Sequence, residues 1–303
     1  QLADAARLRA PAAAALAPAR AHVAAALAGT RTATIALPAS AGGASAILAI
    51  PPRAGGERLP WVLRPHGGPH SVTTDEFAVQ TALLLAAGVA VLQPNYRGSL
   101  SFGAAFGESL LGQVGALDVD DCGALARLAL QQHADALDPQ RGGCYGGSHG
   151  GFLTAWLLGH PRHKDLFRCG VLWNPVTNLP SMVTVTDIPE WCVAECLPKD
   201  GPPLAWPLTD EQLAAMYAKS PISVVDKVRV PSLMLLGAAD QRVPHSQGRE
   251  WVAALQSQPS PPEVVALEYP GEGHAIGGAE QQAHAVQSAV SWLLEHTAKS
   301  TTP

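Results

Sequence analysis

The sequence lacks a surplus of charge of one sign. It contains 20 Lys and Arg against 25 Asp and Glu, which gives a formal net charge of −5, and no long run of either sign. A groove for nucleic acid or a surface for anionic membranes requires clustered cations. The composition therefore disfavours nucleic acid and membranes as partners.

Long hydrophobic runs and paired cysteines are also missing. The longest apolar stretch near the start, residues 11–17, is shorter than the ~20 residues that cross a bilayer, and no later stretch reaches that length. The five cysteines are an odd number and include no Cys-x-x-Cys pair. This pattern disfavours a zinc site built on cysteines and predicts reduced thiols, as is typical of a cytoplasmic protein.

The sequence contains no glycine-rich dinucleotide fingerprint, no phosphate loop and no internal repeat. Metal-binding histidine pairs are also poorly supported. His66 and His70 are four residues apart, but the intervening Gly-Gly-Pro prevents the helix that would align them. His160 and His163 flank a proline and are interpreted as a surface pair at a helix end. We therefore expect neither a metal nor an organic cofactor.

The 303 residues, 47% of them apolar, are enough for one large domain with a sizeable core. Residues 1–30 are Ala-rich and interrupted by two prolines, which favours an N-terminal helix or linker. Residues 31–298 are predicted to form the main domain, and residues 299–303 a C-terminal tail. The chain begins at Gln1, which leaves open whether a targeting peptide or other segment precedes it.

Short β-rich runs alternate with amphipathic helical patterns along the main domain. The predicted strands cover residues 33–37, 46–50, 61–64, 89–93, 169–173, 233–236 and 264–269. The predicted helices cover residues 77–87, 119–131, 150–158, 247–255 and 281–294. Such alternation predicts an α/β fold with a mostly parallel sheet and helices on both faces. The initial strands, joined without helices, are expected to form an antiparallel edge.

Residues 177–219 interrupt this alternation. The segment contains six prolines, together with Trp and Tyr residues. An insertion between two sheet strands commonly forms a cap or the wall of a pocket. We expect that role for residues 177–219.

The run Gly-Gly-Ser-His-Gly at residues 146–150 fits the G-x-S-x-G pattern. In this pattern a sharp strand-to-helix turn presents a serine hydroxyl at the carboxyl end of a sheet, and small residues are needed because strand and helix approach closely. The match falls between an apolar segment and a helical one. Ser148 is therefore the candidate nucleophile, although a glycine-rich turn with a bystander serine is the alternative.

An activated serine needs a base, and the base needs an orienting carboxylate. In this fold class the order along the chain is Ser, acid, His, with each residue following a strand. Asp240 follows one predicted strand and His274 follows the next, which makes them the candidate acid and base. The rival acids, Asp187 and Asp226, do not follow a strand in this way.

His-Gly-Gly-Pro at residues 66–69 comes directly after the predicted strand 61–64. Two glycines allow a backbone N–H to face a developing oxyanion. We assign the oxyanion hole to the N–H groups of Gly68 and His149. An ordinary β-turn is the alternative for residues 66–69.

Seven motifs in this order resemble the catalytic domain of the acylaminoacyl-peptidases, in the prolyl oligopeptidase family of serine peptidases. They are HGGPHS at 66–71, NYRGS at 95–99, GGSHGGF at 146–152, NPV at 174–176, TDIPEWC at 186–192, KSPI at 219–222 and DQRVP at 240–244. The resemblance covers about residues 46–295. The serine and aspartate motifs are shared by the whole family, whereas the TDIPEWC segment is more particular to the eukaryotic-type acylaminoacyl enzymes.

The resemblance implies an α/β-hydrolase fold with Ser148 as nucleophile, Asp240 as orienting acid and His274 as base. It implies release of an N-acyl amino acid from an N-acylated peptide, without a cofactor. The alternatives are a carboxylesterase-like hydrolase of small esters and a non-catalytic module with the same fold. The number of subunits stays open, a homo-oligomer included.

Two features depart from the family pattern. The β-propeller that restricts access in the family has no counterpart in these 303 residues. The strand before Ser148 contains Gly142 and Gly143, which are expected to weaken it.

A peptidase specific for acylated N-termini must reject a free ammonium group, and an apolar pocket does so because burying an unpaired ammonium is costly. The insertion supplies apolar candidates for the wall of such a pocket, namely Ile188, Trp191, Cys192 and Val193, and Val243 is a further candidate. Ordinary packing of the cap is the alternative for these side chains.

Overall fold

The computed structural model describes residues 23–25, 27–53, 55–198 and 206–298. Of the Ala-rich segment, only residues 23–25 and 27–30 are described, so the predicted linker lies largely outside the described residues, and the predicted tail, residues 299–303, lies wholly outside them. No helix in the described ranges is both long and apolar enough to cross a membrane.

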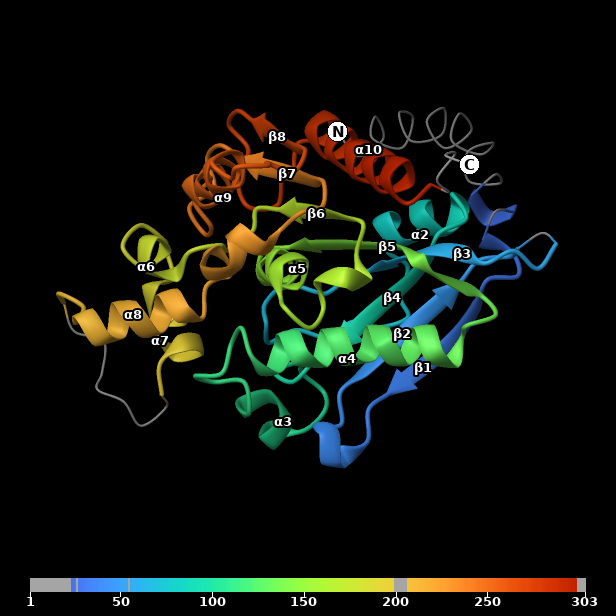
Figure 1. Ribbon diagram of the computed structural model, residues 1–303, viewed down its shortest axis with the longest axis horizontal. Coiled ribbons are helices and arrows are strands. Elements are labelled where there is room, and N and C mark those ends of the chain that lie inside the picture. Colours follow the sequence, from blue (N-terminus) through green and yellow to red (C-terminus); the bar gives the residue numbers. More distant parts are fainter. Residues whose placement is uncertain (1–22, 26, 54, 199–205, 299–303) are drawn as a thin grey trace, which may run out of the picture.

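One eight-stranded sheet forms the centre of the molecule, with the order β1-β2-β4-β3-β5-β6-β7-β8 (Figure 1). The strands are β1 Arg31–Ala36, β2 Ser45–Ile50, β3 Leu59–Leu63, β4 Ala90–Asn95, β5 Leu137–Gly147, β6 Cys169–Trp173, β7 Ser232–Gly237 and β8 Val264–Tyr269. The α-helices are α2 Val79–Ala86, α3 Ala104–Glu108, α4 Leu117–Gln132, α5 His149–Gly159, α6 Leu179–Met182, α7 Pro189–Cys196, α8 Asp210–Ala218, α9 Ser246–Gln256 and α10 Ala279–His296. The described residues also form three 3-10 helices, η1 Ala39–Ala41, η2 Lys164–Leu166 and η3 Pro221–Lys227.

The predicted α/β class with a mostly parallel sheet is confirmed, and the antiparallel edge is confirmed for β1 and β2. The expectation was wrong for the third predicted strand. β3 lies between β4 and β5 and runs parallel to both. The connection from β2 to β3 therefore crosses the position that β4 occupies in the sheet. No helix separates β2 from β3 in the sequence, so the sequence did not indicate this crossing.

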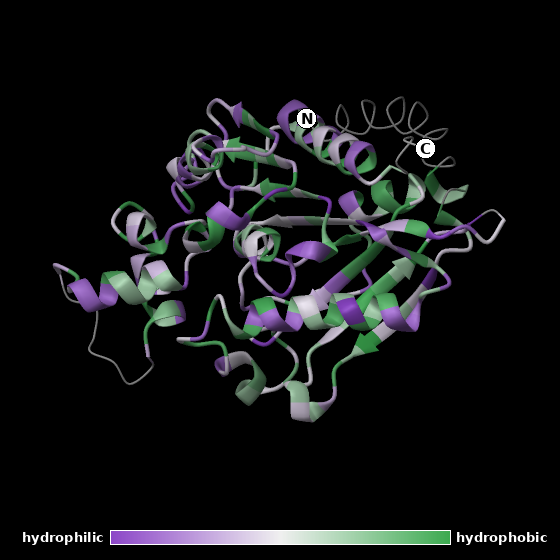
Figure 2. Cartoon of the chain, viewed as in Figure 1, coloured by the Kyte–Doolittle hydropathy of each residue, from purple (hydrophilic) through white to green (hydrophobic). Residues whose placement is uncertain are grey.

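Helices cover both faces of the sheet, and each face has its own apolar core. Helices α2 and α10 pack on one face, where Leu84 and Leu293 contact the sheet residues Val62 and Val91. Helices α4, α5 and α9 cover the other face with side chains such as Leu125, Phe152 and Trp251. Burial on both faces explains why β4 and β7 are buried along their whole length. Figure 2 shows hydrophobic residues on the strands of the sheet and on the helices that cover it.

The glycines of β5 permit close packing in the middle of the sheet. A Cβ at Gly142 would lie 2.4 Å from the carbonyl oxygen of Leu166 and 2.7 Å from the indole of Trp61. A Cβ at Gly143 would lie 2.8 Å from the Leu293 side chain. A larger residue is therefore excluded at position 142, where backbone and indole atoms occupy the space, whereas at position 143 the end of the Leu293 side chain would have to move.

The insertion carries α6, α7 and α8, which lie to one side of the sheet (Figure 1). Helix α7 reaches back to the main domain, since the N–H groups of Gly112 and Val114 donate to the carbonyl oxygens of Ala194 and Glu195. The insertion is thus anchored near the carboxyl ends of the parallel strands.

We expect Gly142→Ala to lower the free energy of unfolding by about 1–3 kcal/mol, because a methyl group would overlap Leu166 and Trp61. Gly107→Ala in α3 is the control, because no atom lies within 4 Å of its added Cβ. The control should be neutral or stabilising by up to about 1 kcal/mol. Urea unfolding of the two variants and the parent chain measures both values. Equal stability of Gly142→Ala and the parent would contradict the packing argument.

Candidate active site

Ser148 lies in the turn between β5 and α5, with φ 56° and ψ −122°, a backbone conformation that is strained for a residue other than glycine. The neighbouring glycines make this turn possible. A Cβ at Gly146 would lie 2.1 Å from the Gly150 carbonyl oxygen, and one at Gly150 would lie 2.3 Å from the Pro65 carbonyl oxygen. The G-x-S-x-G pattern is therefore required here by steric contact, and it presents Ser148 beyond the end of β5.

Asp240 and His274 meet beyond the ends of β7 and β8. His274 Nδ1 lies 2.7 Å from Asp240 Oδ2, and the Asp240 side chain is fully buried. The other carboxylate oxygen, Oδ1, accepts the N–H groups of Arg242 at 2.9 Å and Val243 at 3.0 Å. These contacts satisfy the buried carboxylate and hold the imidazole in one orientation.

The rival acids have other surroundings. Asp187 pairs with Arg242 at 2.6 Å, and Asp226 is an exposed residue of η3. The Arg242 guanidinium lowers the pKa of Asp187. Asp240 alone of the three candidate acids is hydrogen-bonded to His274.

Ser148, His274 and Gly68 line the same pocket, whose volume is about 300 Å³. Within the described chain, no hydrogen bond joins the Ser148 hydroxyl to His274. Such catalytic hydrogen bonds are often long before substrate binds. The structure therefore brings the predicted nucleophile, base and acid to one place.

The His-Gly-Gly-Pro loop runs alongside the Ser148 turn. A Cβ at Gly67 would lie 3.4 Å from the Ser148 Cβ, and Gly68 has φ 123°, a value that favours glycine. Opposite this loop, His149 is the first residue of α5, where a backbone N–H has no partner within the helix. Both backbone groups assigned to the oxyanion hole thus belong to segments that adjoin Ser148.

Asn174 is a positioning residue whose role the sequence did not indicate. It follows β6 with φ 40°, accepts the Gly237 N–H at 2.8 Å and donates to the His274 carbonyl oxygen at 2.8 Å. These two bonds connect the ends of β6, β7 and the His274 loop. The motif at residues 174–176 was visible in the sequence, but its contacts are about 60 and 100 residues away along the chain.

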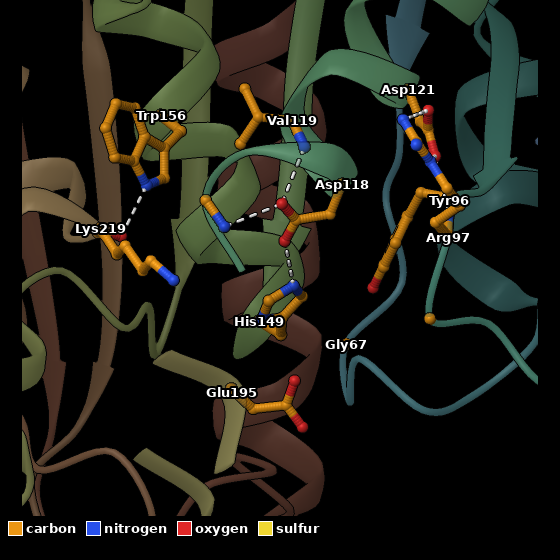
Figure 3. A network of polar contacts seen from close by, with 12 residues as sticks. Gly67, Tyr96, Arg97, Asp118, Val119, Asp121, His149, Trp156, Glu195 and Lys219 are labelled. Carbon is orange, nitrogen blue, oxygen red and sulfur yellow. Dashed lines mark hydrogen bonds and ion pairs between the residues drawn. The ribbon is translucent and has the colours of Figure 1, made fainter. Parts of the chain in front are cut away.

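A buried pair between His149 and Asp118 was also missed (Figure 3). His149 Nε2 lies 2.9 Å from Asp118 Oδ2, and both side chains are fully buried. Asp118 Oδ1 accepts the N–H groups of Gly115 at 2.8 Å and Val119 at 2.9 Å. The side chain of His149, which follows Ser148, is therefore fixed to α4.

The pocket wall is largely apolar and comes from the insertion and the Asp240 loop. Three of the five side chains that we assigned to the pocket wall line it, namely Ile188, Trp191 and Val243, and Val176 and Met182 join them. The expectation was wrong for Cys192 and Val193. Cys192 is fully buried and Val193 packs against the core, because the opposite face of α7 points inward.

Arg242 adds a positive charge to the pocket lining. Its guanidinium binds Asp187, its carbonyl oxygen accepts the Thr186 hydroxyl at 2.7 Å, and the Asp187 N–H donates to the Gln241 carbonyl oxygen at 3.1 Å. The TDIPEWC segment of the insertion is thus bound directly to the loop that carries Asp240. Wall and acid loop therefore hold a fixed relative position.

The interpretation of His160 and His163 as a surface pair was wrong for His163. Its side chain is buried against α4, and burial lowers its pKa to about 4. His160 remains half-buried at the end of α5. The chain turns back after Pro161, and this turn places the His163 ring against α4 instead of in solvent.

His66 supports the oxyanion loop from inside. Its Nε2 lies 2.9 Å from the Ser99 hydroxyl, and the Tyr96 hydroxyl donates to its carbonyl oxygen at 2.8 Å. Burial lowers the pKa of His66 from 6.5 to about 4. The ring is therefore uncharged at neutral pH.

Comparisons with known proteins agree with this geometry. Residues 75–300 match the model of the prolyl oligopeptidase family. The chain is 38% identical to the acylamino-acid-releasing enzyme of Homo sapiens over 245 residues, which are 79% of this chain and 32% of that protein. It is 38% identical to the enzyme of the same name in Arabidopsis thaliana over 234 residues, 76% of this chain and 29% of that protein. The chain thus spans about a third of the length of these relatives.

Solved structures share the fold. A puromycin hydrolase superposes with a TM-score of 0.74 at 26% identity, covering 88% of this chain and 39% of that one. The acylaminoacyl peptidase of Pyrococcus horikoshii superposes with a TM-score of 0.76 at 21% identity, covering 90% of this chain and 42% of that one.

The lowered pKa of His66 predicts a loss of stability in acid. Between pH 6.5 and 4 the unfolded chain binds a proton at this residue that the folded chain does not, so the free energy of unfolding falls as pH is lowered. The contribution of His66 between pH 7 and pH 5 should be about 2 kcal/mol. Urea unfolding across this range, for the parent and His66→Asn, measures it.

His66→Asn should show a shallower dependence on pH, by about that amount. His133→Asn, at the end of α4 and away from this loop, should keep the slope of the parent. Identical slopes for all three proteins would contradict the assignment of this acid sensitivity to His66.

Proposed function

Because the chain belongs to the prolyl oligopeptidase family, we propose that it is a serine peptidase that releases an N-acyl amino acid from the N-terminus of an acylated peptide. The observation that carries the proposal is that Ser148 and His274 line the same, largely apolar pocket. The 38% identity to acylamino-acid-releasing enzymes supports the substrate class.

In the proposed reaction Ser148 Oγ attacks the carbonyl carbon of the first residue, and His274 Nε2 takes the hydroxyl proton. Asp240 stabilises the resulting imidazolium through the 2.7 Å contact at Nδ1. The tetrahedral oxyanion accepts the N–H groups of Gly68 and His149. His274 then gives the proton to the leaving amine, and the C–N bond breaks.

A water molecule completes the cycle. His274 takes a proton from the water as its oxygen attacks the acyl-enzyme carbonyl, and the proton returns to Ser148 Oγ when the ester bond breaks. The products are the N-acyl amino acid and a peptide shortened by one residue. The described residues provide every group that these proton transfers use.

The pocket favours an acylated over a free N-terminus for two reasons. Its apolar wall, including Trp191 and Ile188, offers no carboxylate partner to an ammonium group, whose desolvation is costly. The carboxylate beside this wall, that of Asp187, is already paired with Arg242 at 2.6 Å and does not serve as a partner for an ammonium group. An uncharged acyl group needs no such partner, so we infer that the pocket receives the acylated end of the substrate.

We also infer a cytoplasmic location. All five cysteines are buried and free, which suits a reducing compartment. Burial raises the pKa of Cys144, Cys169 and Cys192 to about 12, so these thiols remain protonated and unreactive at neutral pH.

Ser148→Ala should abolish turnover, with a loss of several orders of magnitude in kcat, and should abolish labelling by a fluorophosphonate probe. The serine oxygen is the atom that forms the covalent bond in both cases. Ser246→Ala, an exposed serine at the start of α9, is the matched control and should keep both properties. Labelling of Ser148→Ala at another serine would show that Ser148 is not the nucleophile, and a parent chain without labelling would favour a non-catalytic module.

An acetylated peptide should be cleaved at least about a hundredfold faster, in kcat/KM, than the same peptide with a free amine, since a desolvation penalty of about 3 kcal/mol corresponds to that factor. Trp191→Ala should lower kcat/KM for the acetylated peptide more than for a small activated ester, which makes fewer contacts beyond the reacting carbonyl. Trp206→Ala is the control, because Trp206 lies in the same insertion and is 56% exposed.

Equal losses on both substrates in Trp191→Ala would assign Trp191 to general packing. A parent enzyme that hydrolyses the ester but neither peptide would favour the carboxylesterase alternative.

A further inference from the structure

Three side chains of the types that serve as metal ligands, two histidines and an aspartate, meet where α4 packs beside the end of α5, outside the catalytic pocket. Asp120 lies in the first turn of α4, His160 follows the last residue of α5, and His163 comes one turn later. One ligand atom from each of the three lies within 4.8 Å of the others. The catalytic pocket has none of these residues in its lining.

Gly123 of α4 leaves space for the imidazole of His163. His163 is 95% buried, since 5% of its surface is exposed, and a Cβ at Gly123 would lie 2.3 Å from its Nδ1. Glycine in a helix interior lowers helix propensity. A larger residue at position 123 would overlap the imidazole of His163. Glycine is therefore required at this position of α4, although it lowers the helix propensity.

The imidazoles of His160 and His163 lie side by side next to α4. Their ring centroids are 4.6 Å apart with an interplanar angle of 18°. His163 Nε2 lies 3.4 Å from Asp120 Oδ1, which is long for a hydrogen bond to a carboxylate. The rings and the carboxylate are thus gathered together without a strong bond between either imidazole and Asp120.

Arg162 competes for the carboxylate. Its guanidinium lies 2.6 Å from Asp120 Oδ1, but its side chain is 66% exposed. Exposed ion pairs of this kind contribute little stability, so the guanidinium can turn toward solvent at small cost. Release of Arg162 exposes an anionic oxygen beside two imidazoles.

We propose that Asp120, His160 and His163 form a binding site for a divalent transition-metal ion of the zinc class. Two imidazoles and one carboxylate are the donor set that such ions prefer, and water completes the coordination. A bound ion would join α4 to the end of the helix that begins directly after Ser148. The Asp118–His149 pair already joins the same two helices at the first residue of α5.

The test is titration of the full chain, first treated with EDTA, with ZnCl₂ in a calorimeter at neutral pH. We expect one saturable equivalent of zinc, and a visible absorption band when CoCl₂ replaces it. His160→Ala should weaken the affinity by about tenfold or more, because it removes one of three protein ligands. His133→Ala, at a histidine that directly follows α4 and lies outside the cluster, should bind as the parent does.

Arg162→Ala gives the sharpest result. Loss of a competing cation should tighten zinc binding by about threefold or more. If the Arg162–Asp120 ion pair were only structural, Arg162→Ala would change the stability of the zinc-free chain and leave its affinity for zinc unchanged. Asp120→Asn keeps the shape of the side chain and should weaken binding, which covers the case in which His160→Ala fails to fold.

The proposal is overturned if the parent shows no saturable binding, or if Asp120→Asn and His160→Ala bind as the parent does. It is equally overturned if His274→Ala abolishes binding, since the ion would then occupy the catalytic histidine. None of these readouts depends on peptidase activity.

Discussion

The close approach of α5 to β5 at Ser148 is the constraint on which the rest of the site depends. Gly146 and Gly150 allow backbone atoms to meet where any side chain would overlap. The contact holds Ser148 in a strained conformation at the start of α5. The strain persists because the sheet and α5 are buried on both sides, so the turn cannot relax without separating them.

Two pairs of histidine and carboxylate lie around this turn, and their environments differ. Asp240 is buried, but the side chain of its partner His274 is 31% exposed and reaches the pocket. Asp118 and His149 are both fully buried, so neither ring nor carboxylate can reach a substrate. The first pair is therefore suited to proton transfer and the second to holding backbone in place. Both pairs consist of a histidine and an aspartate, so the difference between their roles comes from burial and not from residue type.

The insertion became part of the site through contacts that link it to the acid loop. Asp187 and Thr186 bind the Arg242 segment, which also carries the N–H groups that satisfy Asp240. A shift of the pocket wall would therefore disturb the carboxylate that orients His274. On the proposed function, this loop would couple substrate selection to catalysis.

The sequence by itself determined the α/β class and the placement of most strands and helices, and it indicated Ser148, Asp240 and His274 as the candidate nucleophile, acid and base. These follow from local signals, since periodicity, glycine spacing and position after a strand are all read within a short window. It could not determine the position of β3, because pairing between strands distant in sequence depends on how the chain crosses the sheet. The assignment of Ile188 and Trp191, but not Cys192, to the pocket also required the orientation of α7.

Only the tertiary structure revealed Asn174, the Asp118–His149 pair and the burial of His163. Each of these depends on contacts between segments that are about 30 to 100 residues apart, for which the local sequence carries no signal. A polar residue has the same local pattern whether it faces solvent or a buried partner. The fold decides between the two, because an unsatisfied polar group in the core is costly and only the packed elements determine which partners are within reach.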